Sequence, residues 1–112
     1  MSFKEEWLKK QKEAYKTSVV HGFEVGDRNN AQACLKIALI HSELSEAVEA
    51  LRLGNPPDSH IPEFNSVSAE LADVVIRIMN FAELFEMDVA GAVEAKMAYN
   101  ANRPFKHGGK KF

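Results

Sequence analysis

Two short stretches of the chain carry acidic pairs whose spacing suits metal chemistry. Glu43 and Glu46 lie three residues apart in HSELSEAVEALR, and Glu70 and Asp73 repeat this spacing in AELADVV. Residues three apart share one face of a helix, so each pair would point two carboxylates in one direction. Four carboxylates brought together repel one another unless a cation neutralises them, and Mg2+ prefers oxygen ligands. The spacing therefore predicts a magnesium site between two helices, with these four acids as metal ligands.

The neighbours of these pairs separate them from ordinary surface acids. Acid pairs at this spacing occur five times in the chain, where chance would give about two, so the spacing alone is weak evidence. Glu43 and Glu46 have Leu39, Ala47 and Ala50 four residues away, where a surface helix often supplies lysine. Charges among apolar neighbours usually have a partner, and a metal ion would be one. The alternative interpretation is a solvated helix face.

Composition limits the class of protein. The 112 residues suffice for a single domain, 1–112, and 46% hydrophobic with 27% charged residues is ordinary for a soluble globular chain. A net charge of -2 argues against a nucleic-acid polymer bound through its phosphates. The single Cys34, expected to be a buried small residue, the charged first segment and the lack of a membrane-length apolar run predict a cytoplasmic protein with no membrane partner.

Helical periodicity predicts an all-α, four-helix bundle-like protomer, and no segment alternates as a strand would. The four helices are expected over about 2–21, 31–53, 66–85 and 89–103, with N-caps at Ser2, Asn30, Ser66 or Ser68, and Asp88. The third helix is apolar on more than one side, so we expect both sides to be buried, in a central helix or an oligomer interface. Val89, Val93 and Met97 would form the inner stripe of the fourth helix.

Polar residues on the third helix extend the candidate site. Arg77 and Asn80 follow Asp73 by four and seven residues, so they share its face and could contact a phosphate or a base. An internal ion pair between Arg77 and Asp73, with Asn80 as an interfacial hydrogen-bonder, explains the same residues equally well.

Candidates outside the third helix are less specific. Lys96, Asn100 and Arg103 share one face of the fourth helix, although the helix dipole favours basic residues near a C-terminus in any case. Trp7 and Tyr15 are candidates for a base pocket, but such residues are more often core. The basic tail 103–112 lacks the framework of a phosphate-binding P-loop. No Glu is followed three residues later by His, which counts against a ferritin-like di-iron bundle.

Taken together, these residues resemble the all-alpha nucleoside triphosphate pyrophosphohydrolases of the MazG family. The family signature is ExxE on one helix and ExxD on the next, followed by a Lys-x-x-x-Asn, an arginine and a basic tail, and the match covers about 32–112. The resemblance implies a homodimer or homotetramer whose site assembles on Mg2+, with Mn2+ as a substitute. It implies catalytic and metal-binding roles for Glu43, Glu46, Glu70 and Asp73. The candidate substrate-binding residues are Trp7, Arg77, Asn80, Lys96, Asn100, Arg103 and Lys110.

The implied reaction is hydrolysis of a nucleoside triphosphate between its α and β phosphates, which gives the monophosphate and pyrophosphate. Phosphoryl transfer needs positioning and charge neutralisation more than a covalent nucleophile, so metal-binding carboxylates with nearby cations are sufficient equipment. The expected role is cleaning of the deoxynucleotide pool. One rival is a narrow-specificity relative that acts on dUTP or phosphoribosyl-ATP. The other is a non-enzymatic helical interaction module, whose stability would not depend on metal.

Overall fold

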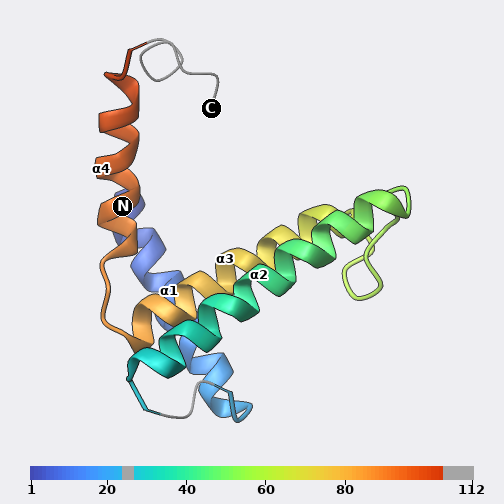
Figure 1. The fold of residues 1–112 in the computed structure, drawn as a ribbon, viewed down its shortest axis with the longest axis horizontal. Coiled ribbons are helices and arrows are strands. Elements are labelled where there is room, and N and C mark those ends of the chain that lie inside the picture. Colours follow the sequence, from blue (N-terminus) through green and yellow to red (C-terminus); the bar gives the residue numbers. More distant parts are fainter. Residues whose placement is uncertain (24–26, 105–112) are drawn as a thin grey trace.

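The computed structural model describes residues 1–23 and 27–104, and these form four helices in the predicted order (Figure 1). The helices are α1 (Phe3–Val20), α2 (Asn30–Arg52), α3 (Ser66–Leu84) and α4 (Val89–Ala101). Within the described ranges there is no strand, and an isolated bridge between Pro57 and Asn65 closes the loop that joins α2 to α3. The all-α prediction is therefore confirmed for the protomer.

Side-chain caps set where the helices begin. The predicted caps at Ser2 and Asp88 are confirmed, because each side chain accepts a backbone N–H of the first turn that follows it. The other two caps lie earlier than predicted, at Asn29 instead of Asn30 and at Asn65 instead of a serine of α3. Several neighbouring residues in NN and NSVS are good N-caps, so sequence preference alone does not select among them.

The ends of α1, α2 and α3 share one kind of turn. The residue after each C-cap is left-handed, with φ of 83° at Gly22, 86° at Gly54 and 55° at Glu86. The N–H of the following residue reaches back to the last turn, as when Phe23 donates to the Ser18 carbonyl at 2.8 Å. This is the Schellman arrangement, which satisfies carbonyls that the helix itself leaves unpaired. It also fixes Phe23 beside the end of α1.

Helices α2 and α3 run antiparallel along each other, and α1 crosses α3 (Figure 1). Ala47, Ala50 and Ala69 are buried, and such small side chains let two helices approach closely. Toward the end of α3, Phe81 is buried and stacks on Phe85 with ring centroids 4.7 Å apart. α3 is thus the central helix, which was one of the two positions predicted for it.

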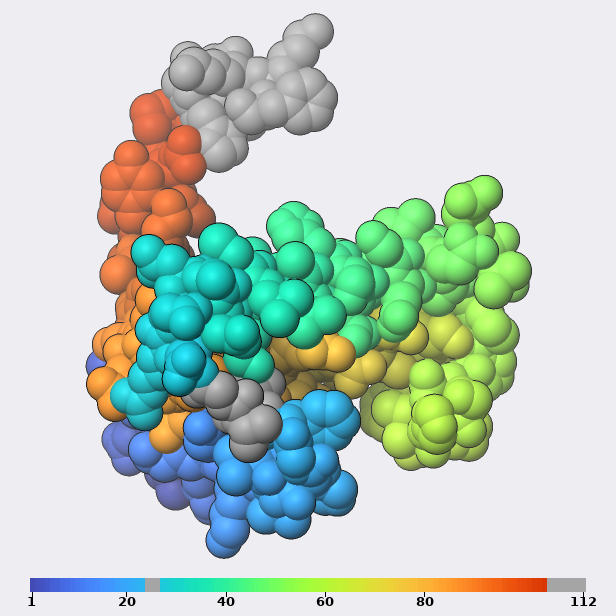
Figure 2. All heavy atoms as spheres, turned by 60° about the horizontal axis from the view of Figure 1, so that its bottom comes forward, coloured from blue at the N-terminus to red at the C-terminus, as the bar shows by residue number. Residues whose placement is uncertain are grey.

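Helix α4 is attached to the rest of the protomer mainly through its first turns. Ala90 is fully buried, and an ion pair of 2.9 Å between Lys4 and Asp88 ties α1 to the start of α4. The later turns extend away from the other helices (Figure 2). The inner stripe predicted for this helix is therefore wrong beyond Val93, since Met97 is 67% exposed.

Several apolar side chains predicted to be buried are exposed in the protomer. On α3, Leu71, Val75 and Ile76 are exposed, so burial of both sides of this helix does not occur within one chain. Cys34 is also exposed, which contradicts the prediction that it is a core residue. The Cys34 prediction is therefore wrong within the protomer, whereas burial of the exposed α3 residues at an oligomer interface stays a prediction. None of the described helices combines the length and the apolar run that crossing a membrane requires.

Candidate metal centre

Three of the four predicted acids meet between α2 and α3. One carboxylate oxygen each from Glu43, Glu46 and Glu70 can be chosen so that all lie within 4.8 Å of one another, an arrangement that could hold a metal ion. Glu43 and Glu46 lie on adjacent turns of α2, and Glu70 lies in the first turns of α3. The predicted convergence of the ExxE helix on the next helix is therefore confirmed for these residues. Glu43 is buried, Glu70 is half-buried and Glu46 is exposed, so the cluster opens to solvent on the Glu46 side.

The electrostatics of the cluster centre on Glu70. Burial, followed by the nearby carboxylates of Glu46 and Glu43, raises the pKa of Glu70 from 4.5 to about 7. Its Oε2 atom is buried and has no hydrogen-bond partner among the described residues. A buried carboxylate oxygen without a partner is costly, and a proton or a cation would relieve that cost. This set of oxygen donors therefore suits a hard divalent ion.

Asp73 is close to the cluster but is not one of the three grouped acids. It is exposed, and partial burial followed by the charge of Glu43 raises its pKa above the ordinary range. The charge of Arg77 opposes this by lowering the pKa of Asp73, and the loop residues Asp58 and His60 raise and lower it, respectively. Asp73 therefore stands at the edge of the site, where its role as a fourth metal ligand stays a prediction.

Arg77 has a different partner from the one considered on the sequence. Its Nε donates to Glu43 Oε1 at 2.9 Å, with the Glu43 side chain 12% exposed. The pair links α3 to α2, whereas the sequence alternative was a pair with Asp73 within α3. Arg77 therefore neutralises part of the negative charge at Glu43 and leaves Glu46 and Glu70 to interact with each other.

The predicted cationic residues of α4 do not reach the acids within one chain. Lys96, Asn100 and Tyr99 are exposed on the part of α4 that extends away from α2 and α3 (Figure 2). Lys96 Nζ and Arg103 Cζ lie 5.5 Å and 5.6 Å from the Tyr99 ring centroid, so both cations border the same aromatic side chain. Lys110 lies outside the described residues. The protomer thus separates the carboxylates from this cationic face.

Trp7 is engaged in the packing of α1. Its indole N–H donates to Gln11 Oε1 at 3.1 Å, and Gln11, itself buried, donates to Glu83 Oε1 at 3.1 Å. Glu83 follows Glu70 by thirteen residues on α3, a separation of about 20 Å along the axis. The structure therefore keeps Trp7 away from the acids. Tyr15, the other predicted base-pocket residue, lines a separate cavity of about 540 Å³ with Lys12 and Glu83.

A cavity of about 290 Å³ adjoins the acid cluster and shares Glu43 with it. Its other lining residues are Ser18, Phe23, Asp73, Ile76, Arg77 and Asn80. Asn80 is 5% exposed and its Nδ2 donates to Ser18 Oγ at 2.8 Å, while its Oδ1 is buried without a partner among the described residues. Asn80 and Arg77 were predicted from their spacing. Ser18 and Phe23 were missed, because nothing in the sequence relates the end of α1 to the middle of α3.

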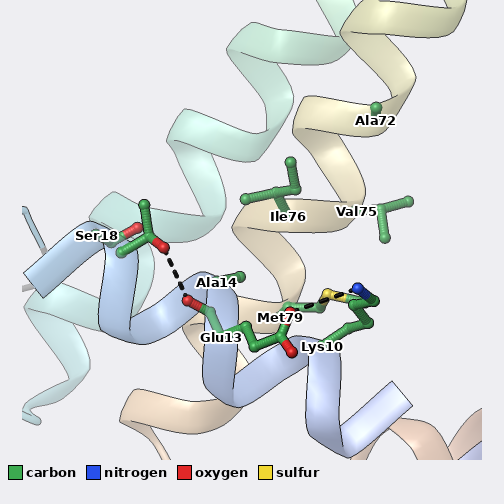
Figure 3. Close-up of a pocket in the computed structure, with 9 residues that line it drawn as sticks. Lys10, Glu13, Ala14, Ser18, Ala72, Val75, Ile76 and Met79 are labelled. Atoms are coloured by element: carbon green, nitrogen blue, oxygen red, sulfur yellow. Dashed lines mark hydrogen bonds and ion pairs between the residues drawn. The ribbon is translucent and has the colours of Figure 1, made fainter. Parts of the chain in front are cut away.

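A larger groove of about 680 Å³ lies between α1 and α3 and shares Ser18 and Ile76 with the cavity beside Glu43 (Figure 3). Val75, Ile76 and Met79 line it on α3, and the Lys10 and Glu13 side chains of α1 pair with each other at 3.4 Å. None of the three grouped acids lines this groove. Its surface is mainly apolar, so it is less suited to phosphate chemistry than the cavity beside Glu43.

Comparisons of the chain with known protein families, with curated protein sequences and with solved structures find no match.

Proposed function

We propose that this protein is a magnesium-dependent nucleoside triphosphate pyrophosphohydrolase of the MazG type. The observation that carries the proposal is the convergence of Glu43, Glu46 and Glu70 from two helices, with one buried carboxylate oxygen that no residue in the described part of the chain pairs with. The ExxE and ExxD pattern that suggested the family supplies these same residues. The products would be a nucleoside monophosphate and pyrophosphate, and the role would be cleaning of the deoxynucleotide pool.

The acids of the site would divide between two parts in this reaction, holding the metal ion and orienting the attacking water. Glu43, Glu46 and Glu70 would hold Mg2+, or Mn2+ in its place, and Glu70 would release its proton as the cation binds. When bound, the ion would neutralise charge on the substrate phosphates and on the departing pyrophosphate. Asp73 is exposed at the edge of the cluster and its pKa is raised, properties that suit a carboxylate that orients the attacking water and accepts its proton.

The substrate phosphates also need cations, and these point to more than one copy of the chain. Lys96 and Asn100 lie on the extended part of α4 and Arg103 lies just after its end, so we assign these three residues to phosphates bound at a neighbouring copy in a homodimer or homotetramer. An apolar stripe on α2 supports association, because Leu44, Val48 and Leu51 recur at helical spacing and are 40%, 58% and 61% exposed.

The test is release of pyrophosphate and monophosphate from the four standard dNTPs, dUTP and phosphoribosyl-ATP, each with magnesium and with EDTA. Glu46→Gln should abolish turnover. The matched control is Glu49→Gln, which changes an exposed acid one turn further along α2 that pairs with Arg52 at 3.7 Å. Magnesium-dependent release confined to one nucleotide would establish a narrow-specificity relative. Absence of release across the panel from the folded protein would contradict the proposal.

The second candidate is a non-enzymatic helical interaction module. The exposed apolar residues of α2 and α3 favour it, since they suit a protein partner as well as a second copy. The two candidates differ in their response to metal. A ligand present at a hundredfold excess over its dissociation constant stabilises the folded state by about 2.7 kcal/mol. Magnesium should therefore raise the melting temperature of the enzyme and leave that of the interaction module unchanged.

A further inference from the structure

We propose that Asn80 is the residue that recognises the nucleobase, by accepting a hydrogen bond from a base N–H in the cavity beside Glu43. The inference rests on the proposed function, because it takes the acid cluster as the place where the phosphates bind. The acids account for the phosphates of the substrate, and the inference concerns its nucleobase. Three features lead to this inference: the position of the cavity, the charge of its lining, and the unpaired side-chain oxygen of Asn80.

The position of the cavity suits the nucleoside end of the substrate. Glu43 belongs to the acid cluster and also lines the cavity, so a molecule with phosphates at the cluster can extend directly into it. The volume of about 290 Å³ lies at the small end of the range for ligand pockets. It is suitable for a compact group such as a nucleoside, and a triphosphate chain would remain outside.

The charge of the cavity lining favours a neutral occupant over a phosphate. Glu43 and Asp73 bring two carboxylates to the lining, and Arg77 brings one guanidinium whose Nε already donates to Glu43 at 2.9 Å. The lining itself is therefore net negative, so phosphates are favoured beside the cation of the acid cluster and not in this cavity. A neutral base with hydrogen-bond donors is favoured, and the sequence-based option that Arg77 contacts a phosphate is disfavoured.

The side-chain oxygen of Asn80, which has no partner among the described residues, defines the contact with the base. Asn80 Nδ2 donates to Ser18 Oγ at 2.8 Å, which orients the side chain and leaves Oδ1 buried without a partner among the described residues. Buried polar atoms almost always have a partner, and because Asn80 is one of the residues that line the cavity, an N–H of a ligand bound there can supply it. Each of the common nucleobases, guanine included, offers an N–H on the edge used for base pairing.

Ser18 couples the amide to the aromatic wall of the same cavity. Its hydroxyl accepts from Asn80, and its carbonyl accepts the N–H of Phe23 at 2.8 Å in the turn that ends α1. Phe23 is 66% exposed at the cavity, and an exposed aromatic ring is a suitable surface on which a base can stack. The hydrogen-bonding residue and the stacking residue are thus fixed to a single helix end.

The decisive experiment pairs a variant with a modified substrate. For the dNTP that is cleaved best, kcat/KM is measured on that nucleotide and on its counterpart methylated at the base N–H, for the wild type and for Asn80→Leu. A lost hydrogen bond to a buried polar group corresponds to about a 10- to 100-fold change. We expect the wild type to discriminate between the two substrates by that factor, chiefly through KM. Asn80→Leu should cleave both alike, at the lower efficiency.

A binding measurement separates this inference from the proposed function. The side-chain amide resonance of Asn80 is followed by NMR while the matching deoxynucleoside, which has no phosphate to hydrolyse, is added to the protein. A saturable shift of the Asn80 resonance supports the base contact even if no triphosphate is cleaved. This shift should be smaller or absent in Ser18→Ala. Unchanged resonances, or equal cleavage of the normal and methylated nucleotides by the wild type, would overturn it. The wild-type comparison holds even if Asn80→Leu does not fold.

Discussion

Replacing Glu70 with glutamine should stabilise the metal-free protein at neutral pH and leave its stability in acid unchanged. In the folded state the pKa of Glu70 is raised to about 7, whereas in the unfolded chain it returns to about 4.5. Below pH 4.5 the Glu70 carboxyl is mostly protonated in both the folded and the unfolded state. As the pH rises from 4.5 to 7 the unfolded state loses its proton first, so the stability of the folded protein falls across this window. Glutamine carries no charge at any pH and avoids this loss.

The size of the effect follows from the shift. A difference of 2.5 pKa units between 4.5 and about 7 would correspond to about 3.4 kcal/mol at 1.36 kcal/mol per unit. Glu70 is only half-buried, so solvent screening reduces this to about 1 to 2 kcal/mol. For 112 residues, an unfolding entropy of about 2.1 cal/mol/K per residue converts that energy into about 4 to 9 °C of melting temperature.

The assay is thermal unfolding followed by circular dichroism in EDTA, at pH 4.5 and at pH 7.5. Glu70→Gln should exceed the wild type by about 4 to 9 °C at pH 7.5 and should match it at pH 4.5. Glu63→Gln changes an exposed acid of the loop between α2 and α3 and serves as the control, with no such difference. Magnesium should then stabilise the wild type more than Glu70→Gln. A variant less stable than the wild type at pH 7.5 would refute the reasoning about like charges.

Three further outcomes are expected. Glu46→Ala and Asp73→Ala should each abolish pyrophosphate release while the helical circular dichroism spectrum persists, and near-normal activity in both would exclude this site. Trp7→Phe removes the indole N–H that bonds to Gln11, so unfolding should become easier by about 1 kcal/mol with KM unchanged; a raised KM would return Trp7 to the binding site. Val48→Lys places a charge in the exposed stripe of α2 and should shift the mass measured by light scattering toward the monomer, whereas an unchanged oligomer would show that this stripe is not the interface.

Local signals were sufficient to predict the helices. Ser2 and Asp88 cap where their side-chain chemistry indicates, and Gly54 follows the end of α2 because its φ of 86° is one that side chains disfavour. Burial was predicted less well. Met97 lies at a position that helical periodicity assigns to a core, and Cys34 is of a residue type that is usually buried, but both are exposed. Periodicity shows which side of a helix is apolar, but it does not show whether the partner belongs to the same chain.

The candidate site was predictable where it depends on spacing along one helix. Glu43 and Glu46 were paired correctly because i and i+3 residues share a face, and Glu70 joined them because α2 and α3 pack along their length. The partner of Arg77 was not predictable in this way. Its bond to Glu43 crosses between helices, and the relative rotation of two helices is set by packing that the spacing does not encode.

The distribution of unpaired polar atoms supports the proposed binding site over a solvated acidic face. Where α1 packs on the end of α3, the buried Gln11 accepts from Trp7 and donates to Glu83, so this end of the protomer completes its hydrogen bonds internally. The two buried side-chain atoms without partners in the described part of the chain are Glu70 Oε2 and Asn80 Oδ1. One belongs to the acid cluster and the other to the cavity that shares Glu43 with it. Acids on a solvated face would have water at every oxygen. A site that binds a cation and a base N–H would instead keep one unpaired acceptor for the cation and another for the N–H.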